Sequence, residues 1–169
     1  MFSTLTNFLE KIKIGNGFDV HAFCKDRDCI IGGVKIPFEL GLKGHSDADV
    51  LIHAIIDSLL GAAGYEDIGE LFPDSDDSYK NISSLLLLEK TAGILYENKW
   101  KVINIDCVII CEKPKIQEYK LKMKQNISKI LEIDSNQIGI KGKTSEKLGF
   151  TGRQEGISAS AVCLIYKAE

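Results

Sequence analysis

The stretch SDADVLIHAIIDSLLGAAG, residues Ser46–Gly64, carries the clearest structural signal in the chain. Ser46 or Asp47 can cap the start of a helix here, and Gly61 or Gly64 lies near its end. The large apolar residues between these ends recur at the spacing of an amphipathic helix. They are Val50, Ile52, Ile55, Ile56, Leu59 and Leu60.

On both sides of this helix the pattern changes to that of strands. Before it, Lys13–Phe23 is extended, and Cys29–Ile36 is a hairpin or bulged strand that Pro37 closes. After it, a helix, a strand, a helix with Pro114 in its first turn and two strands are expected. Their ranges are Asn81–Asn98, Lys101–Cys111, Pro114–Leu131, Gln137–Lys141 and Ile157–Tyr166. This order predicts an α+β fold, with helices on one face of a mixed sheet.

Length and composition limit the classes that remain. A chain of 169 residues and 18.7 kDa fits one domain, which we place at residues 13–169 after an N-terminal extension, residues 1–12. The formal charge is 21 − 24 = −3, and no long basic block is present, so nucleic acid is not expected as a partner. No apolar run approaches the ~20 residues that span a bilayer, so no membrane partner is expected either.

The five cysteines are odd in number and have no C-x-x-C spacing. This argues against a disulfide framework and against a thiolate zinc site. A reducing cytoplasm is the setting that this cysteine usage favours.

The three histidines, His21, His45 and His53, lie close together in the sequence. In a strand, residues i and i+2 point to the same side, so Asp19 and His21 converge, and His53 can add a third ligand from the helix. An Asp-His-His set leaves one zinc position open, as in catalytic sites. The alternative is that these are unrelated core and surface residues.

Weaker signals surround this group. Asp57, at i+4 from His53, could accept the other N–H of the imidazole, or it could be a solvated helix carboxylate. The backbone N–H groups after His45 and Ser46 could face an anion, or Ser46 could be an ordinary cap. The acidic segment from Tyr65 to Tyr79 is long for a connecting loop, which indicates a functional role.

Two charged residues near the C-terminal end also have two interpretations. Arg153 lies in a glycine-bearing loop and could contact a phosphate, or it could pair with Glu155. Glu146, preceded by Thr144 and Ser145, could hold a hard divalent cation that bridges phosphates, or it could be a carboxylate in water.

Five motifs occur together and in order: GFDVHAF at residues 17–23, GHSDADV at 44–50, DIG at 67–69, LFPD at 71–74 and EKLGFTGR at 146–153. In this combination the chain resembles the 2-C-methyl-D-erythritol 2,4-cyclodiphosphate synthase family of the non-mevalonate isoprenoid pathway. The resemblance covers about Lys13 to Lys167.

The resemblance implies a lyase that converts 4-diphosphocytidyl-2-C-methyl-D-erythritol 2-phosphate into the cyclic diphosphate and CMP. Asp19, His21 and His53 match the ligands of one zinc ion per subunit. Glu146 matches the carboxylate that holds Mg²⁺ or Mn²⁺ on the diphosphate, and His45 and Thr144 match positions that stabilise the transition state.

The resemblance also implies a set of substrate-binding residues, in segments that contact either the methylerythritol phosphate or the nucleotide. The set is Asp19, Val20, His21, His45, Ser46, Asp67, Ile68, Gly69, Phe72, Pro73, Asp74, Ser75, Asp76, Cys111, Glu112, Lys113, Pro114, Lys115, Ile116, Gln117, Lys143, Thr144, Ser145, Glu146, Phe150 and Arg153.

The family is a homotrimer with sheets packed around a threefold axis and active sites between neighbouring subunits, so the same assembly is implied here. A bacterial-type cytoplasm is expected ahead of a plastid. Two other functions remain open at this point. One is a noncatalytic module that binds cytidine nucleotides or isoprenoid diphosphates, and the other is a metallophosphohydrolase in which metal-bound water attacks.

Overall fold

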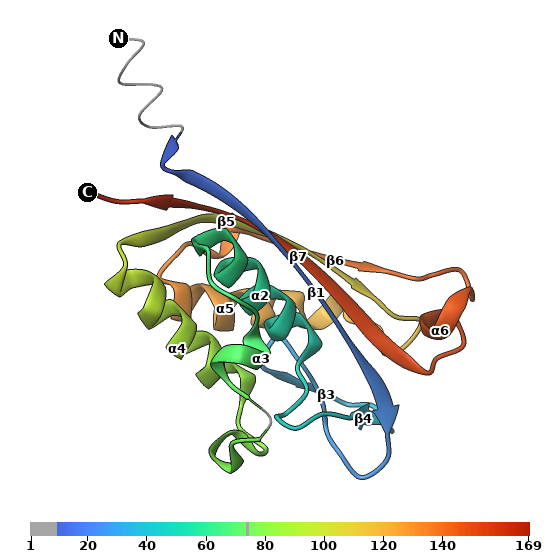
Figure 1. The fold of residues 1–169 in the computed structure, drawn as a ribbon. Coiled ribbons are helices and arrows are strands. Elements are labelled where there is room, and N and C mark those ends of the chain that lie inside the picture. Colours follow the sequence, from blue (N-terminus) through green and yellow to red (C-terminus); the bar gives the residue numbers. More distant parts are fainter. Residues whose placement is uncertain (1–9, 74) are drawn as a thin grey trace.

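A five-stranded mixed sheet with the order β4-β1-β7-β5-β6 forms the frame of the fold, in a computed structural model that describes residues 10–73 and 75–169 (Figure 1). Only β5 and β6 are parallel, and the other pairs are antiparallel. The strands are β1 (Ile12–Cys24), β4 (Gly41–Leu42), β5 (Trp100–Ile110), β6 (Ile138–Lys143) and β7 (Gly156–Lys167).

Three helices, α2 (Val50–Ala63), α4 (Ser84–Glu97) and α5 (Lys120–Leu131), cover one face of this sheet (Figure 1). Helix α2 packs on β1 and β7, and two glycines of β1 permit its close approach. A Cβ atom at Gly15 would lie 1.9 Å from the Ser58 carbonyl oxygen, and one at Gly17 would lie 2.0 Å from the Ala54 carbonyl oxygen. The helix backbone therefore rests directly on the strand.

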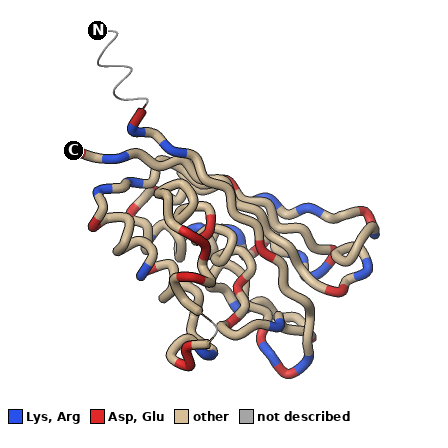
Figure 2. The backbone as a smooth tube through the Cα atoms, viewed as in Figure 1, with Lys and Arg blue, Asp and Glu red and all other residues tan. Residues whose placement is uncertain are grey.

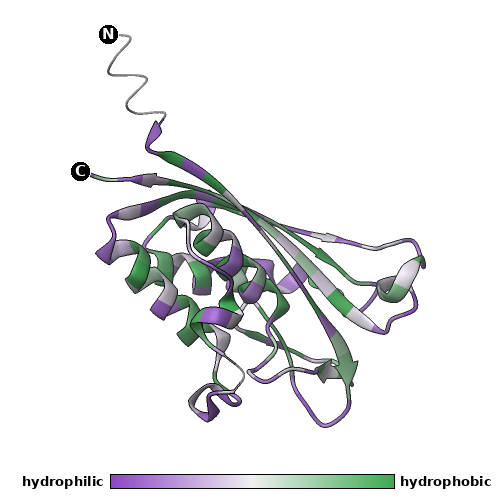
Figure 3. Ribbon diagram, in the orientation of Figure 1, coloured by the Kyte–Doolittle hydropathy of each residue, from purple (hydrophilic) through white to green (hydrophobic). Residues whose placement is uncertain are grey.

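The two faces of the sheet differ in what covers them. On β7, alternate side chains face the helices and are buried: Ile157, Ala159, Ala161, Cys163 and Ile165. The opposite face carries large apolar side chains that this chain leaves exposed, and Figure 3 shows apolar colour along these strands. They are Ile14 at 71%, Phe18 at 57%, Val20 at 45% and Val162 at 37% exposure.

Shorter elements complete the fold. Strands β2 (Cys29–Ile31) and β3 (Val34–Ile36) form a hairpin whose two turn residues, Gly32 and Gly33, have φ of 62° and 68°. Positive φ at both central residues is what a type I′ turn requires. The remaining elements are α3 (Ile68–Leu71), η1 (Asp77–Tyr79), η2 (Gln117–Tyr119), η3 (Ser135–Gln137) and α6 (Gly149–Gly152).

The structure confirms the α+β class and the one-sided helical cover, and it corrects three details. The cap of α2 is Asp49, whose carboxylate accepts hydrogen bonds from Leu51 and Ile52, rather than Ser46 or Asp47. Helix α5 begins at Lys120, so Pro114 is not in its first turn. The segment from Tyr65 to Tyr79 is not all loop, since it contains α3 and η1.

The structure also bears on the expectations for the N-terminal extension, for membrane-spanning segments and for the cysteines. Most of the expected N-terminal extension, residues 1–9, lies outside the described residues. Within residues 10–73 and 75–169, no helix is long and apolar enough to span a membrane. All five cysteines have free thiols. Figure 2 shows acidic residues around α3, basic residues along β6, and residues of both charges near α6.

Candidate functional site

The expected metal ligands meet where β1 passes the first turns of α2. Asp19 and His21 lie two residues apart on β1, so both side chains point to the α2 side of the sheet, as those of Gly15 and Gly17 would. His53 lies on the first turn of α2, four residues after the Asp49 cap. The fully buried Asp49 also accepts hydrogen bonds from the backbone N–H groups of Gly32 (2.8 Å) and Gly33 (2.6 Å), which ties the hairpin turn to this helix end.

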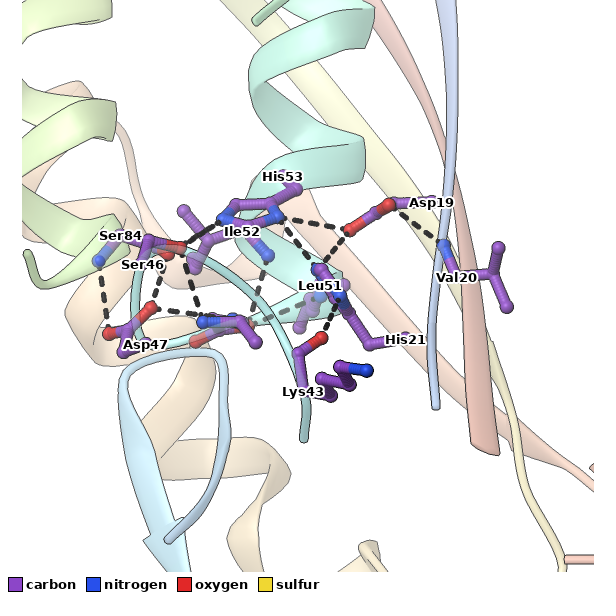
Figure 4. A network of polar contacts seen from close by, with 12 residues as sticks. Asp19, Val20, His21, Lys43, Ser46, Asp47, Leu51, Ile52, His53 and Ser84 are labelled. Carbon is purple, nitrogen blue, oxygen red and sulfur yellow. Dashed lines mark hydrogen bonds and ion pairs between the residues drawn. The ribbon is translucent and has the colours of Figure 1, made fainter. Parts of the chain in front are cut away.

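Three ligand atoms form a nearly equilateral triangle (Figure 4). Asp19 Oδ2 lies 3.0 Å from His21 Nε2 and 3.0 Å from His53 Nδ1, and the two nitrogens are 3.1 Å apart. Tetrahedral zinc with bonds of ~2.0 Å places its ligands ~3.3 Å apart. The donor set and the spacing therefore fit a zinc ion, and they are the one such group of His, Cys, Asp and Glu in the part of the chain that the structure describes.

The charges within this triangle reinforce one another. Burial opposes ionisation of Asp19, but hydrogen bonds and attraction from His21 and His53 hold the pKa of its carboxyl well below its usual range. Burial favours the neutral form of His53, yet its hydrogen bond to Asp19 and the attraction of nearby carboxylates raise its pKa above the ordinary 6.5. The cluster therefore keeps an anionic carboxylate ready for a cation.

In each ligand histidine, the ring nitrogen that points away from the triangle, which we call the outer nitrogen, lies within hydrogen-bond distance of a protein group. His21 Nδ1 lies 2.9 Å from the Lys43 carbonyl oxygen, which accepts its N–H. His53 Nε2 lies 2.8 Å from Ser84 Oγ and 3.1 Å from Ser46 Oγ. Such partners fix the ring orientation of metal-ligating histidines.

The expectation that Asp57 holds His53 is wrong. Asp57 Oδ1 accepts a hydrogen bond from the backbone N–H of Ile68 at 2.8 Å, so this carboxylate anchors α3 to α2. Hydroxyl groups take the outer nitrogen of His53 instead. Sequence spacing could not reveal Ser84, because it lies 31 residues away on another helix.

A pocket of about 250 Å³ opens beside the ligand triangle. We refer to it as the metal-side pocket. It brings together residues expected from the resemblance and three that were not, namely Gly44, Tyr79 and Leu87. Its lining is His21, Gly44, His45, Ser46, His53, Ile68, Gly69, Phe72, Tyr79 and Leu87.

Two devices hold the segments around this pocket. The Arg27 guanidinium donates to the carbonyl oxygens of Gly44 and Ser46 and so clamps the backbone on both sides of His45. On the other side, Phe72 and Tyr79 stack edge to face with ring centroids 5.4 Å apart. His45 is thereby carried on a fixed loop rather than on a free one.

The carboxylates of the acidic segment that the structure describes hold the local backbone. Asp67 accepts from the backbone N–H of Glu70 at 3.1 Å and caps α3, and the exposed Asp76 accepts from that of Ser78 at 2.9 Å. Pro73 and Ser75 flank Asp74 in the same segment, and Asp74 lies outside the described residues. The roles expected for these residues stay predictions.

A second pocket, of about 150 Å³, lies at the ends of β5 and β6. We refer to it as the strand-end pocket. Most of its lining was expected to bind the nucleotide, and Lys120 and Gly142 were not named. The lining is Cys111, Pro114, Lys115, Ile116, Gln117, Lys120, Gly142, Lys143 and Thr144. Its three lysines give it the positive charge that a phosphate needs.

The loop after β6 places Thr144 and Glu146 beside the strand-end pocket. The Thr144 hydroxyl donates to the Glu146 carboxylate, and Glu112 Oε1 accepts from the Lys147 backbone N–H at 3.1 Å. Glu146 and Lys147 both have positive φ, at 52° and 64°, a conformation that costs side-chain-bearing residues roughly 1 kcal/mol or more each. The fold holds Glu146 in an orientation that a relaxed loop would not favour.

The other expected residues are distributed around these sites. Ser145 Oγ accepts from Thr151 Oγ1 at 2.8 Å, and Phe150 is 39% exposed on α6. Arg153 pairs with Glu155 at 2.8 Å, which was the alternative to a phosphate contact. Val20 points to the bare face of the sheet. Lys113 precedes Pro114 of the strand-end pocket and is exposed.

The two pockets lie at the same position along the strands but toward opposite edges of the sheet. Asp19 of β1 is level with Ala159 of β7, Ala159 with Ile109 of β5, and Ile109 with Gly142 of β6. Three strand spacings of ~4.8 Å therefore separate the backbones of the two sites by roughly 14 Å. They share no lining residue.

An open Asp-His-His triangle beside a pocket, on a helix-covered mixed sheet, defines a class of metal-dependent enzyme sites. The chain belongs to the YgbB family, whose model matches residues 12–166. A curated relative from Caldicellulosiruptor bescii, 2-C-methyl-D-erythritol 2,4-cyclodiphosphate synthase, is 58% identical over 90% of this chain and 98% of its own.

Solved structures agree with this assignment. The IspF structure from Plasmodium falciparum, a CDP complex, is similar with a TM-score of 0.82 and 36% identity, over 94% of this chain and 97% of that chain. The bifunctional IspDF from Campylobacter jejuni has a TM-score of 0.89 and 42% identity over 94% of this chain. This chain spans 43% of that longer protein.

Proposed function

We propose that this chain catalyses the reaction for which its curated relatives are named, the formation of 2-C-methyl-D-erythritol 2,4-cyclodiphosphate in isoprenoid precursor biosynthesis. The observation that carries this function is the Asp19–His21–His53 triangle beside the metal-side pocket, in a chain 58% identical to such a synthase. The substrate is 4-diphosphocytidyl-2-C-methyl-D-erythritol 2-phosphate.

The reaction needs no external nucleophile. An oxygen of the 2-phosphate attacks the β-phosphorus of the same molecule, and a new P–O bond closes the ring. The bond from the β-phosphorus to the bridging oxygen breaks, and CMP leaves with that oxygen and its electron pair. Holding both ends of one flexible substrate supplies much of the rate, since it turns ring closure into a near-attack geometry.

We assign zinc to Asp19, His21 and His53, and Mg²⁺ or Mn²⁺ on the substrate diphosphate to Glu146. A zinc ion there supplies Lewis acidity to a phosphate oxygen. The residues of the chain position the substrate. His45, on the loop clamped by Arg27, faces the metal-side pocket, and Thr144 lies at the strand-end pocket. We assign both residues to stabilising charge on the transferring phosphate.

The nucleotide belongs in the strand-end pocket. Residues from segments 111–117 and 142–144 line it, its lining includes the lysines Lys115, Lys120 and Lys143, and a relative in this family is described as a CDP complex. The methylerythritol phosphate end then belongs in the metal-side pocket, among Ile68, Gly69 and Phe72. We assign the remaining residues of the acidic segment to the same end of the substrate.

The separation of the pockets supports an assembly in which neighbouring copies share a substrate. Within one chain β7 and β5 lie between the two sites, so a substrate bound in both would have to cross the sheet. The bare sheet face, with Ile14, Phe18, Val20 and Val162, offers apolar area for contact between copies. We therefore assign the chain to a homotrimer with active sites between subunits. The five free cysteines fit a reducing, cytoplasmic setting.

Phosphorus NMR of the zinc-loaded protein with Mg²⁺ and the substrate tests this function. We expect CMP and a cyclic diphosphate from the parent protein, and a loss of about 100-fold or more in turnover for His53→Ala and for Glu146→Gln. Ser83→Ala is the matched control, because the Ser83 side chain makes no capping hydrogen bond. A linear diphosphate product would indicate a hydrolase, and nucleotide binding without any product would indicate a binding module.

A further inference from the structure

The imidazole of His53 separates two environments. Its Nδ1 belongs to the ligand triangle, 3.0 Å from Asp19 Oδ2. Its Nε2 points the other way, to the fully buried hydroxyl of Ser84 on the first turn of α4, at 2.8 Å (Figure 4). A neutral imidazole carries one proton, so only one of these nitrogens can offer a lone pair to a metal.

The contacts of Ser84 decide which nitrogen carries that proton. The Ser84 hydroxyl donates its single proton to Asp47 Oδ1. Toward His53 it therefore has only lone pairs left, and it must accept from an Nε2–H group. In the neutral ring, the proton on Nε2 leaves Nδ1 with its lone pair toward Asp19 and His21, whereas the Nδ1–H that donates to Asp19 belongs to the protonated ring.

Asp47 is itself held in a fixed orientation. Its Oδ2 accepts from the Ser84 backbone N–H at 3.0 Å, and its Oδ1 accepts from the Asp49 backbone N–H at 3.3 Å. The Asp47 backbone N–H donates to the Ile82 carbonyl oxygen at 3.0 Å. The carboxylate thus caps α4 from the loop before α2, and it can meet the Ser84 hydroxyl only as an acceptor.

The second hydroxyl near Nε2 does not carry the same constraint. Ser46 Oγ is farther away, at 3.1 Å, and it accepts from the Ala48 backbone N–H at 3.2 Å. Among residues 10–73 and 75–169, no carboxylate accepts a hydrogen bond from the Ser46 hydroxyl, so its proton is not fixed in one direction. Ser84 is therefore the partner that determines the proton position.

We propose that Asp47 and Ser84 are positioning residues for the metal site, and that they hold His53 in the tautomer whose Nδ1 binds the ion. The proposal rests on the metal site of the proposed function, but not on the identity of the substrate. Outer partners of this kind are commonly worth 10- to 100-fold in metal affinity. The Asp47–Ser84–His53 chain also couples the start of α4 to a ligand on α2.

Two substitutions test this chain of hydrogen bonds. Ser84→Ala removes the acceptor for Nε2–H and leaves the rest of the residue in place. Asp47→Asn is sharper. Two backbone N–H groups compete for its single carbonyl oxygen, and we expect the shorter contact, from Ser84 at 3.0 Å rather than from Asp49 at 3.3 Å, to keep it, so that the NH₂ group faces the Ser84 hydroxyl. That hydroxyl then donates to His53 Nε2, which moves the ring proton to Nδ1 and blocks the ligand position.

The measurements are zinc affinity, by competition with a chelator, and the tautomer of His53, by long-range ¹H–¹⁵N NMR of the metal-free protein with neutral rings. The chain has only three histidines, so the spectrum can be assigned. We expect zinc binding to weaken about 10- to 100-fold in Ser84→Ala and in Asp47→Asn, with the Nδ1–H form in Asp47→Asn. Ser83→Ala should match the parent in both measurements.

A folded Ser84→Ala protein with parental zinc affinity and an unchanged His53 tautomer would overturn the proposal, whatever the behaviour of Asp47→Asn. Neither readout depends on turnover. A parent protein that binds zinc with the expected tautomer but makes no cyclic product would instead overturn the proposed function and leave this proposal standing.

Discussion

At the scale of single residues, the ligand triangle is a place where protons and a metal compete. Asp19 is kept ionised by the two histidines, and the same attraction raises the pKa of His53 despite its burial. A raised pKa on a metal-binding nitrogen means that protonation begins at a higher pH than in a free histidine. Protons should therefore compete with zinc for His53 already at pH values above the ordinary histidine pKa of 6.5.

Zinc affinity should fall as the pH is lowered past the ordinary histidine value of 6.5, and the fall should already have begun above that value. The sign follows from the raised pKa, because zinc needs the unprotonated Nδ1 and the folded protein holds the competing proton more firmly. We expect at least about a tenfold loss of affinity per pH unit below the pKa. Chelator competition between pH 8 and pH 5.5 measures it, and a flat profile would contradict the assignment of His53 as a ligand.

The buried thiols should be unreactive in the folded protein. Burial raises the pKa of Cys29 and of Cys107 to about 12 and that of Cys111 to about 11, so the reactive thiolate is rare at neutral pH. Cys163 is buried as well, whereas Cys24 is partly exposed. Mass spectrometry after brief alkylation should show one labelled site, Cys24, and five after unfolding. Early labelling of Cys107 would show that the sheet opens on that timescale.

Sequence spacing predicted the residues of the ligand triangle but not the groups around it. Asp19 and His21 converge because strand geometry is regular, and an i+2 spacing has one meaning there. No sequence pattern identifies Ser84 or the Lys43 carbonyl as partners of the histidines, because serines and peptide oxygens occur throughout any chain. Asp57 failed as a partner because its carboxylate found a nearer donor in the Ile68 backbone.

At the scale of secondary-structure elements, the contact between α2 and β1 decides where His53 stands relative to Asp19. Gly15 and Gly17 let the helix backbone touch the strand, with no side chain between them. The helix cap at Asp49 then sets the axial position of its first turn. The metal site is built on this pair of elements, so its geometry depends on how closely they approach.

Gly17→Ala should both destabilise the fold and weaken the metal site. Its Cβ would meet the Ala54 carbonyl oxygen at 2.0 Å, and backbone cannot yield as a side-chain tip can. We expect a loss of about 1–3 kcal/mol in the free energy of unfolding, measured with urea. The control is Gly61→Ala on α2, the helix that carries Ala54. Nothing lies within 4 Å of a Cβ atom at Gly61, so a gain of up to about 1 kcal/mol is expected. Equal effects at both sites would refute the close approach as the cause.

The order of elements could be predicted better than their ends. The alternation in β5 and β7 is strong because one face of each strand is buried. The helical period of α2 is strong because, before its last residue, only a stripe through His53, Asp57 and Gly61 is left partly or fully exposed. The start of α5 was misplaced because Pro114 is compatible with a first helical turn, while here segment 111–117 lines a pocket instead. The short α3 was missed since four residues show no period.

At the scale of the whole molecule, the fold separates what the reaction needs to bring together. The Asp19–His21–His53 triangle lies at strand β1, and the strand-end pocket and Glu146 lie toward the β6 edge of the sheet. Strands β7 and β5 lie between them. Sequence motifs alone, without the family resemblance, could not show this separation, because strand order is a property of long-range pairing. It makes the assembly of copies part of the proposed mechanism.

Mixed assemblies of two inactive variants should recover activity. His53→Ala damages the metal side of each subunit, and Glu146→Gln damages the nucleotide side. If neighbouring subunits share each site, random mixing in equal amounts gives about a quarter of sites with both sides intact, and about a quarter of parental turnover. Co-expression with two affinity tags, followed by the CMP assay, measures this recovery. Mixed assemblies no more active than either variant alone would contradict shared sites.

The position of β7 in the sheet sets the order in which this protein can be made. It is the last strand of the chain, yet it lies between β1 and β5 and joins them by hydrogen bonds along almost its whole length. Until β7 has been synthesised and is free to pair, the β1–β4 and β5–β6 pairs have no strand to connect them. The five-stranded sheet, and the bare face through which copies would meet, can therefore close only once β7 is available to pair with both β1 and β5, which makes this closure a step of high contact order.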